Sequence, residues 1–146
     1  MKKIVALCGV AAVVAVSLTA VSFAGTRSMM GVSAKLTARS EVPAQAVKDA
    51  MATGRFVGTL SGRKLSWKLT FSGLTGKATA AHIHIGAMGK AGGVLAALCG
   101  PCKSGVKGTT TLSARAMRQL SRHVLYVNVH TAKNPNGEIR GQLAEK

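Results

Sequence analysis

Residues Leu65–Ser72 read LSWKLTFS, an unbroken alternation of apolar and polar side chains. Successive side chains of a β-strand point to opposite faces, so this pattern predicts a strand with one face in a core and the other in solvent. A second strand-like run, Phe56–Leu60, precedes it, and the segment Ser61–Lys64 (SGRK) separates the two. We therefore expect a β-hairpin at this point of the chain.

Other strand patterns are spread along the chain. They lie at Val32–Arg39, Thr79–Ile85, Val124–Thr131 and Glu138–Leu143, the last after a turn at Pro135–Gly137. Several short strands separated by turn signals predict an all-β fold, an antiparallel β-sandwich or a small barrel. The segment Gly86–Thr110 is rich in Gly and Ala, and we expect it to be a long excursion between strands.

Helix signals are scarce. The clearest is Ser113–Arg122, where Ala116, Met117 and Leu120 would share one face. A short turn or helix is also expected at Gln45–Ala52. The predicted fold therefore contains one short helix beside its strands.

The beginning of the chain has the features of an export signal. Lys2 and Lys3 precede the apolar run Ile4–Val16, and the small residues Ser22 and Ala24 stand where a signal peptidase reads. We expect cleavage after Ala24, no later transmembrane segment, and a periplasmic, cell-surface or extracellular protein. An uncleaved anchor is the alternative, because the apolar stretch approaches the roughly 20 residues that span a bilayer.

The charge balance is strongly basic, with 20 Lys and Arg against 4 Asp and Glu and a formal net charge of +16. Such a surface attracts polyanions such as acidic envelope polymers at low salt. Arg115, Arg118 and Arg122 on the predicted helix are a candidate anion-binding face. We expect no specific nucleic-acid interface, because one Trp and one Tyr cannot build a stacking platform.

Two cysteines remain after the expected cleavage, in the sequence Cys99-Gly100-Pro101-Cys102. Export places them in an oxidising compartment, so we expect a Cys99–Cys102 disulfide. A reactive Cys-X-X-Cys pair usually opens a helix after a strand, whereas Lys103–Gly105 follows here and is typical of a loop. We therefore expect the bridge to constrain a loop.

The stretch Ala81–Gly86 (AHIHIG) places two histidines one residue apart. On a strand, His82 and His84 project from the same face, with Cα atoms roughly 6.5 to 7 Å apart. In the later run Val124–Thr131 the alternation leaves His130 away from the apolar residues, on the face that also carries Tyr126 and Asn128. If the two runs pair, three imidazoles converge on the outside of the sheet.

Three imidazoles from two strands suit copper or zinc. Glu138 is a candidate for orienting one of the rings through a hydrogen bond. The alternative is that the histidines are hydrogen-bonding residues that hold the Gly-rich excursion and the final hairpin against the sheet.

Most enzyme classes lack their motifs in this chain. The few carboxylates do not suit a paired-carboxylate hydrolase, and a G-x-S-x-G nucleophile elbow, a P-loop and a dinucleotide fingerprint are all missing from the sequence. We expect no catalytic activity, and copper-dependent redox chemistry is the one exception to test.

Several blocks of sequence together resemble the CHRD domain, which is named for chordin, an extracellular antagonist of bone morphogenetic proteins. The blocks are Glu41–Pro43 (EVP), Leu65–Leu69 (LSWKL), Ser72–Gly76 (SGLTG), Ala81–Gly86 (AHIHIG), Leu125–Thr131 (LYVNVHT) and Asn134–Leu143 (NPNGEIRGQL). The resemblance implies an extracytoplasmic, Greek-key-like β-sandwich over residues 35–143 with no established catalytic activity. A signal peptide (1–24), a short segment (25–34) and a tail (144–146) complete the chain.

The resemblance also implies that one face of the fold carries the signature residues, which are the histidines, Tyr126, Asn128, Glu138 and Arg140. The H-x-H pattern with a later His and Arg is similar in outline to copper-zinc superoxide dismutase. No histidine lies between His84 and His123, so the bridging ligand of a dinuclear site is missing and a mononuclear copper site is the form to expect.

Three functions follow as hypotheses. The first is an exported, non-catalytic binding or structural module of the cell envelope or extracellular space, with an unknown protein or an envelope polyanion as partner. The second is a mononuclear copper-binding protein that uses His82, His84 and His130. The third is a cationic adhesin for envelope polyanions.

Overall fold

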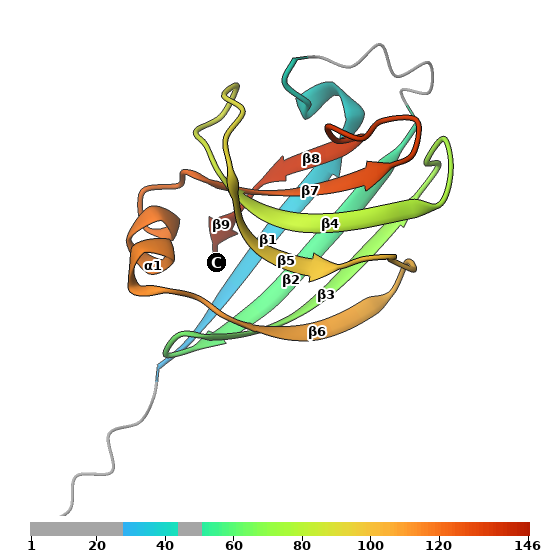
Figure 1. Ribbon diagram of the computed structural model, residues 1–146. Coiled ribbons are helices and arrows are strands. Elements are labelled where there is room, and N and C mark those ends of the chain that lie inside the picture. The colour runs from blue at the N-terminus through green and yellow to red at the C-terminus, as the bar shows by residue number, and fades with distance from the viewer. Residues whose placement is uncertain (1–27, 44–50) are drawn as a thin grey trace, which may run out of the picture.

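The computed structural model describes residues 28–43 and 51–146, which form strands, one 3-10 turn and one α-helix (Figure 1). The elements are β1 (Met29–Thr37), η1 (Ala38–Ser40), β2 (Thr53–Ser61), β3 (Lys64–Ser72), β4 (Ala78–Ile85), β5 (Val94–Cys99), β6 (Val106–Thr111), α1 (Ala114–Leu120), β7 (Leu125–Thr131), β8 (Ile139–Gln142) and β9 (Ala144–Glu145). The expected export signal and most of Gln45–Ala52 lie outside the described residues.

The strands form one antiparallel sheet in the order β5-β4-β7-β8-β1-β2-β3-β6, with β9 paired to β1. The sheet bends until its edge strands β5 and β6 approach each other, which makes a nearly closed barrel (Figure 1). The all-β prediction is confirmed. Thr37 of β1 pairs with Arg140 of β8, so the strands form one continuous sheet and the small barrel describes them better than a sandwich of two separate sheets.

Strand β3 lies against the core on one face, as its alternation predicts. Leu65, Trp67 and Leu69 of β3 are buried, and each fully buried apolar side chain contributes about 1.5–3 kcal/mol. The Trp67 ring stacks on Phe56 at 6.1 Å between centroids, and its Nε1 donates to Thr110 Oγ1 at 3.0 Å. The Trp67 side chain of β3 therefore contacts both neighbouring strands, β2 and β6.

Strand β9, which lies in the expected tail, was not predicted, and neither were β5 and β6, because Gly86–Thr110 is not one long excursion. It contains β5 and β6, the two edges of the sheet. The run VLAALC of β5 has no polar alternation, and the run VKGTTT of β6 has a glycine at its centre. Gly108 is required there, because a Cβ at this position would collide with the Trp67 ring. These segments are strands because β5 pairs with β4 and β6 pairs with β3, and not because of their own sequence patterns.

The predicted helix is confirmed as α1. Ser113 caps it, since its Oγ accepts from Ala116 N at 3.1 Å. Ala116 and Leu120 are buried, and Met117 is partly buried against the same core. Within residues 28–43 and 51–146, none of the helices has the length and hydropathy of a membrane span.

Candidate metal centre

Pairing between β4 and β7 brings three imidazoles together on the outer face of the sheet. His82 lies opposite Asn128, and His130 lies opposite Ala80. The ring centroids are 4.9 Å apart for His82 and His130, 5.6 Å for His82 and His84, and 5.8 Å for His84 and His130. One nitrogen from each ring lies within 4.8 Å of the others. The convergence expected from strand parity is present.

Two backbone carbonyls fix the tautomers of the buried rings. His84 Nδ1 lies 3.0 Å from Gly92 O, and His130 Nδ1 lies 2.9 Å from Pro135 O. A carbonyl oxygen only accepts hydrogen bonds, so both Nδ1 atoms carry the proton and both Nε2 atoms present a lone pair. His130 Nε2 is 3.0 Å from His82 Nδ1, whereas the buried His84 Nε2 has no hydrogen-bond partner among the described residues.

Burial keeps the three rings neutral. Desolvation lowers the pKa of His82, His84 and His130 below the ordinary value of 6.5. The carbonyl bonds of His84 and His130 oppose this shift, whereas repulsion between the rings if they were protonated, and for His84 the charge of Arg140, reinforces it. Because a metal binds the deprotonated imidazole, these rings are in the ligating form at neutral pH.

Tyr126 and Arg140 support His84 from the same face. The Tyr126 ring stacks on His84 at 4.8 Å with an interplanar angle of 11°, and the Arg140 guanidinium lies 3.6 Å from the centre of the Tyr126 ring. Arg140 also donates to Ala87 O at 3.1 Å, and Tyr126 OH donates to Gly92 O at 3.2 Å. The segment between β4 and β5 is therefore held over the imidazoles.

That segment depends on a glycine for its close approach. A Cβ at Gly92 would collide with the carbonyl oxygen of Ile85. Gly92 therefore allows the backbone to lie against the end of β4, where its carbonyl meets both His84 and Tyr126. Sequence patterns carry no signal for such backbone carbonyls, so this contribution to the site was not predicted.

Glu138 does not take the ring-orienting role suggested for it. Its carboxylate accepts from Thr75 N and Oγ1, from Thr131 Oγ1 and from Asn134 Nδ2. These bonds occupy the carboxylate, and the carbonyls of Gly92 and Pro135 meet the rings instead. Burial alone would raise the pKa of Glu138, but the four hydrogen bonds outweigh it and hold the pKa below its ordinary value.

A second buried carboxyl, that of Glu41, bonds to Asn128, the cross-strand partner of His82. Asn128 Nδ2 donates to both carboxylate oxygens of Glu41, at 3.0 and 3.1 Å. Burial raises the pKa of Glu41 to about 7, although the positive charge of Arg140 and the Asn128 bond lower it. Glu41 was recognised only as part of a sequence block, and its neighbourhood with Asn128, the cross-strand partner of His82, was not predicted.

The other candidate residues lie elsewhere on the molecule. Arg115 and Arg118 are exposed on α1, and Arg122 is exposed in the turn that follows. Cys99 and Cys102 form a disulfide with Cα atoms 5.4 Å apart, at the end of β5. Neither group takes part in the histidine cluster.

Comparison with known proteins identifies the family. The CHRD domain model matches residues 32–143, which is more than half of the chain and includes every residue of the site described above. No curated protein and no solved structure gives a significant match. The match includes the strands that carry the histidines and the buried residues around them, Glu41, Asn128, Glu138 and Arg140. The chain therefore belongs to the CHRD domain family.

Proposed function

We propose that this CHRD protein is an exported binding module whose ligand is a transition-metal ion, copper or zinc, held by His82, His84 and His130. One observation carries the proposal. His84 Nε2 is buried, has a lone pair and has no hydrogen-bond partner among the described residues, and one nitrogen of its ring lies within 4.8 Å of nitrogens of the other two rings. An unsatisfied buried polar atom costs about 1–3 kcal/mol, and a bound metal would satisfy it.

The nitrogen positions fit such an ion after a small adjustment. Metal–nitrogen bonds of about 2.0–2.1 Å in a tetrahedral site place ligand nitrogens roughly 3.3 Å apart. His82 Nδ1 and His130 Nε2 are at 3.0 Å, and the third nitrogen lies within 4.8 Å. A metal would replace the proton shared by the His82–His130 pair, and the tautomers of His84 and His130 already suit ligation.

The chemistry of the donor set favours copper or zinc over harder ions. Imidazole nitrogen suits both metals, and divalent copper has the highest affinity in the usual order for such sites. Three protein ligands leave a further position open toward solvent, since His82 is only partly buried. We also propose that the fold has the Greek-key, dismutase-like outline expected from the sequence. The primary role that we propose is metal binding rather than catalysis.

The experiment is metal analysis of the purified protein after titration with copper and with zinc. The variant His82→Ala/His84→Ala/His130→Ala removes the cluster. His123→Asn is the matched control, because His123 is exposed, lies outside the cluster and has a positive φ of 55° that Asn tolerates. We expect one equivalent of metal on the native protein and on the control, and none on the triple variant. Equal binding by all three proteins, or no binding by any, contradicts the proposal.

A second function, attachment to envelope polyanions, is favoured by a different surface. Lys35 lies directly opposite Arg55 on β1 and β2, and Lys68 lies directly opposite Lys107 on β3 and β6. All four side chains are exposed on the outside of the barrel. Like charges in opposite positions of neighbouring strands are destabilising, so a polyanion bound across this face would relieve a repulsion. We propose this sheet face, rather than the helix arginines, as the contact surface.

A further inference from the structure

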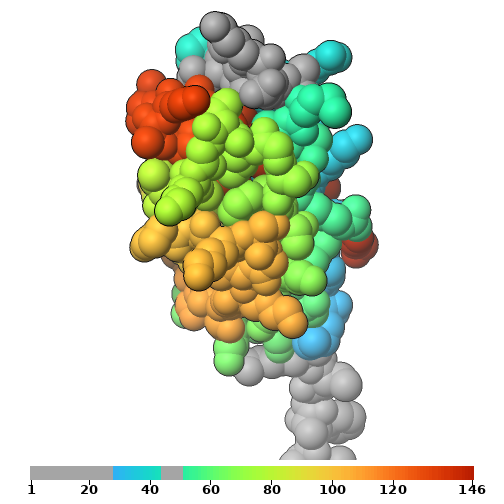
Figure 2. All heavy atoms as spheres, turned by 90° about the vertical axis from the view of Figure 1, so that its right-hand side faces the viewer, coloured from blue at the N-terminus to red at the C-terminus, as the bar shows by residue number. Residues whose placement is uncertain are grey.

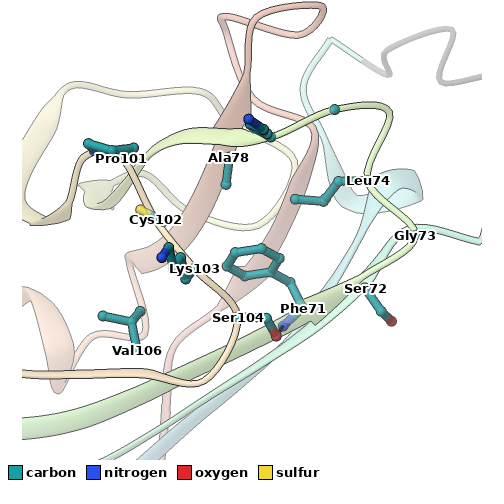
Figure 3. Close-up of a pocket in the computed structure, with 12 residues that line it drawn as sticks. Phe71, Ser72, Gly73, Leu74, Ala78, Pro101, Cys102, Lys103, Ser104 and Val106 are labelled. Atoms are coloured by element: carbon teal, nitrogen blue, oxygen red, sulfur yellow. Dashed lines mark hydrogen bonds between the residues drawn. The ribbon is translucent and has the colours of Figure 1, made fainter.

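A pocket of about 790 Å³ opens at the end of the barrel where β3 leads into β4 (Figure 3). Phe71, Leu74, Ala78 and Val106 contribute side chains that point into a common space. Pockets of about 300–1,000 Å³ with mainly apolar walls are typical ligand sites, and the mouths of β-barrels are one of their usual places. None of the three histidines lines this space.

The wall formed by the disulfide loop is fixed by hydrogen bonds. Cys102 N donates to Ala78 O at 3.1 Å, and Gly105 N donates to Leu69 O at 2.8 Å. Phe71 N donates to Ser104 Oγ at 2.8 Å. The loop is therefore tied to both β3 and β4, and Figure 2 shows these segments in green and orange next to each other on this side of the molecule.

The opposite wall is fixed by Glu138. Its carboxylate accepts from the backbone N and the Oγ1 of Thr75, the residue that follows Leu74. The Glu138 side chain is fully buried and thus anchors the loop that carries Leu74. With both walls held, the pocket is preformed, and a ligand would not have to order either loop.

The lining combines apolar surface with positive charge. Phe71, Leu74 and Val106 pack against the core, and each is partly exposed where it lines the pocket. Lys77 and Lys103 also line the pocket and are exposed, and the described lining contains no acidic side chain. We propose that this pocket binds an amphipathic anion, a single hydrocarbon chain that ends in a carboxylate. The chain would cover the apolar wall and the carboxylate would meet the two lysines.

The test is calorimetric titration of the purified protein with dodecanoate below its micelle concentration. We expect saturable binding of one equivalent. The variant Lys77→Gln/Lys103→Gln should weaken binding at least tenfold, whereas Lys68→Gln/Lys107→Gln, with the same charge change on the sheet face, should bind like the native protein. Dodecyltrimethylammonium, with the same chain and the opposite charge, should bind at least tenfold more weakly than dodecanoate.

A further variant tests the apolar wall. Leu74→Asp places a carboxylate in a partly exposed position of the pocket and should abolish dodecanoate binding, with thermal unfolding as the check that the fold is retained. No saturable binding to the native protein, equal binding of the cationic amphiphile, or equal loss in the two lysine variants would overturn the proposal. The histidine cluster lies outside the pocket, so metal binding by the Leu74→Asp variant should be unchanged.

Discussion

His82 Nδ1 lies 3.0 Å from His130 Nε2, although the two residues are 48 positions apart in the chain. Burial lowers the pKa of both rings, so both are neutral at neutral pH. One proton then lies between the two nitrogens and forms the hydrogen bond. The pairing of β4 with β7 alone produces this contact. Polar residues on this face would not by themselves require two ring nitrogens in contact beside a third ring whose buried Nε2 has no partner among the described residues.

Metal binding should stabilise the fold. An ion that binds the folded protein and not the unfolded chain adds about 2.7 kcal/mol at a free concentration one hundred times its Kd. We expect copper to raise the Tm of the native protein and a chelator to reverse the change. His84→Ala should lose the copper-dependent part, and His123→Asn should keep it. Differential scanning calorimetry with and without copper measures both, and a shift that survives in His84→Ala would place the ion elsewhere.

Glu41 should make stability fall as the pH rises. Burial raises its pKa from 4.5 to about 7, so the folded state binds the proton more readily than the unfolded chain does. Its contribution is fully present below pH 4.5 and is lost as the pH rises toward 7. Glu41→Gln keeps an oxygen for Asn128 without the charge, and should gain roughly 2–3 kcal/mol relative to native over that interval. Urea unfolding at a series of pH values gives the difference, and parallel curves for the two proteins would count against it.

Gly108 should be intolerant of even a methyl group. A Cβ there collides with the buried Trp67 ring, so Gly108→Ala should lower the free energy of unfolding by about 1–3 kcal/mol. Gly76→Ala is the control, because a Cβ at Gly76 meets no atom within 4 Å. Equilibrium unfolding monitored by the single Trp compares the two variants. Similar stability of both would show that the ring moves aside without cost.

The basic sheet face should matter more for polyanion binding than the helix. The variants Lys35→Gln/Lys68→Gln/Lys107→Gln and Arg115→Gln/Arg118→Gln/Arg122→Gln each remove three positive charges. We expect the first to elute from heparin-agarose at clearly lower salt than the second, because its lysines lie on one face of the sheet, on β3, its neighbour β6, and β1 beyond β2. Equal elution of the two variants would mean that net charge alone governs the interaction.

Sequence patterns predicted the strands and the helix that have one buried face and one exposed face. The alternation of β3 and the apolar face of α1 are local, and both are present as expected. The edge strands β5 and β6 were not predicted, because their pairing with β4 and β3 replaces any local signal. Strand parity also placed the three histidines together. The carbonyls of Gly92 and Pro135 that orient two of the rings have no side-chain signal and required the structure.

Anomalous diffraction from crystals soaked with copper, recorded at the copper absorption edge, locates the ion directly. Ligation by the three imidazoles predicts one strong peak on the outer face of β4 and β7, about 2.0–2.1 Å from His82 Nδ1, His84 Nε2 and His130 Nε2. Rings left in their present hydrogen bonds, with no peak between them in well-ordered crystals, would contradict it. The histidines would then be residues that hold the loops after β4 and β7 against the sheet.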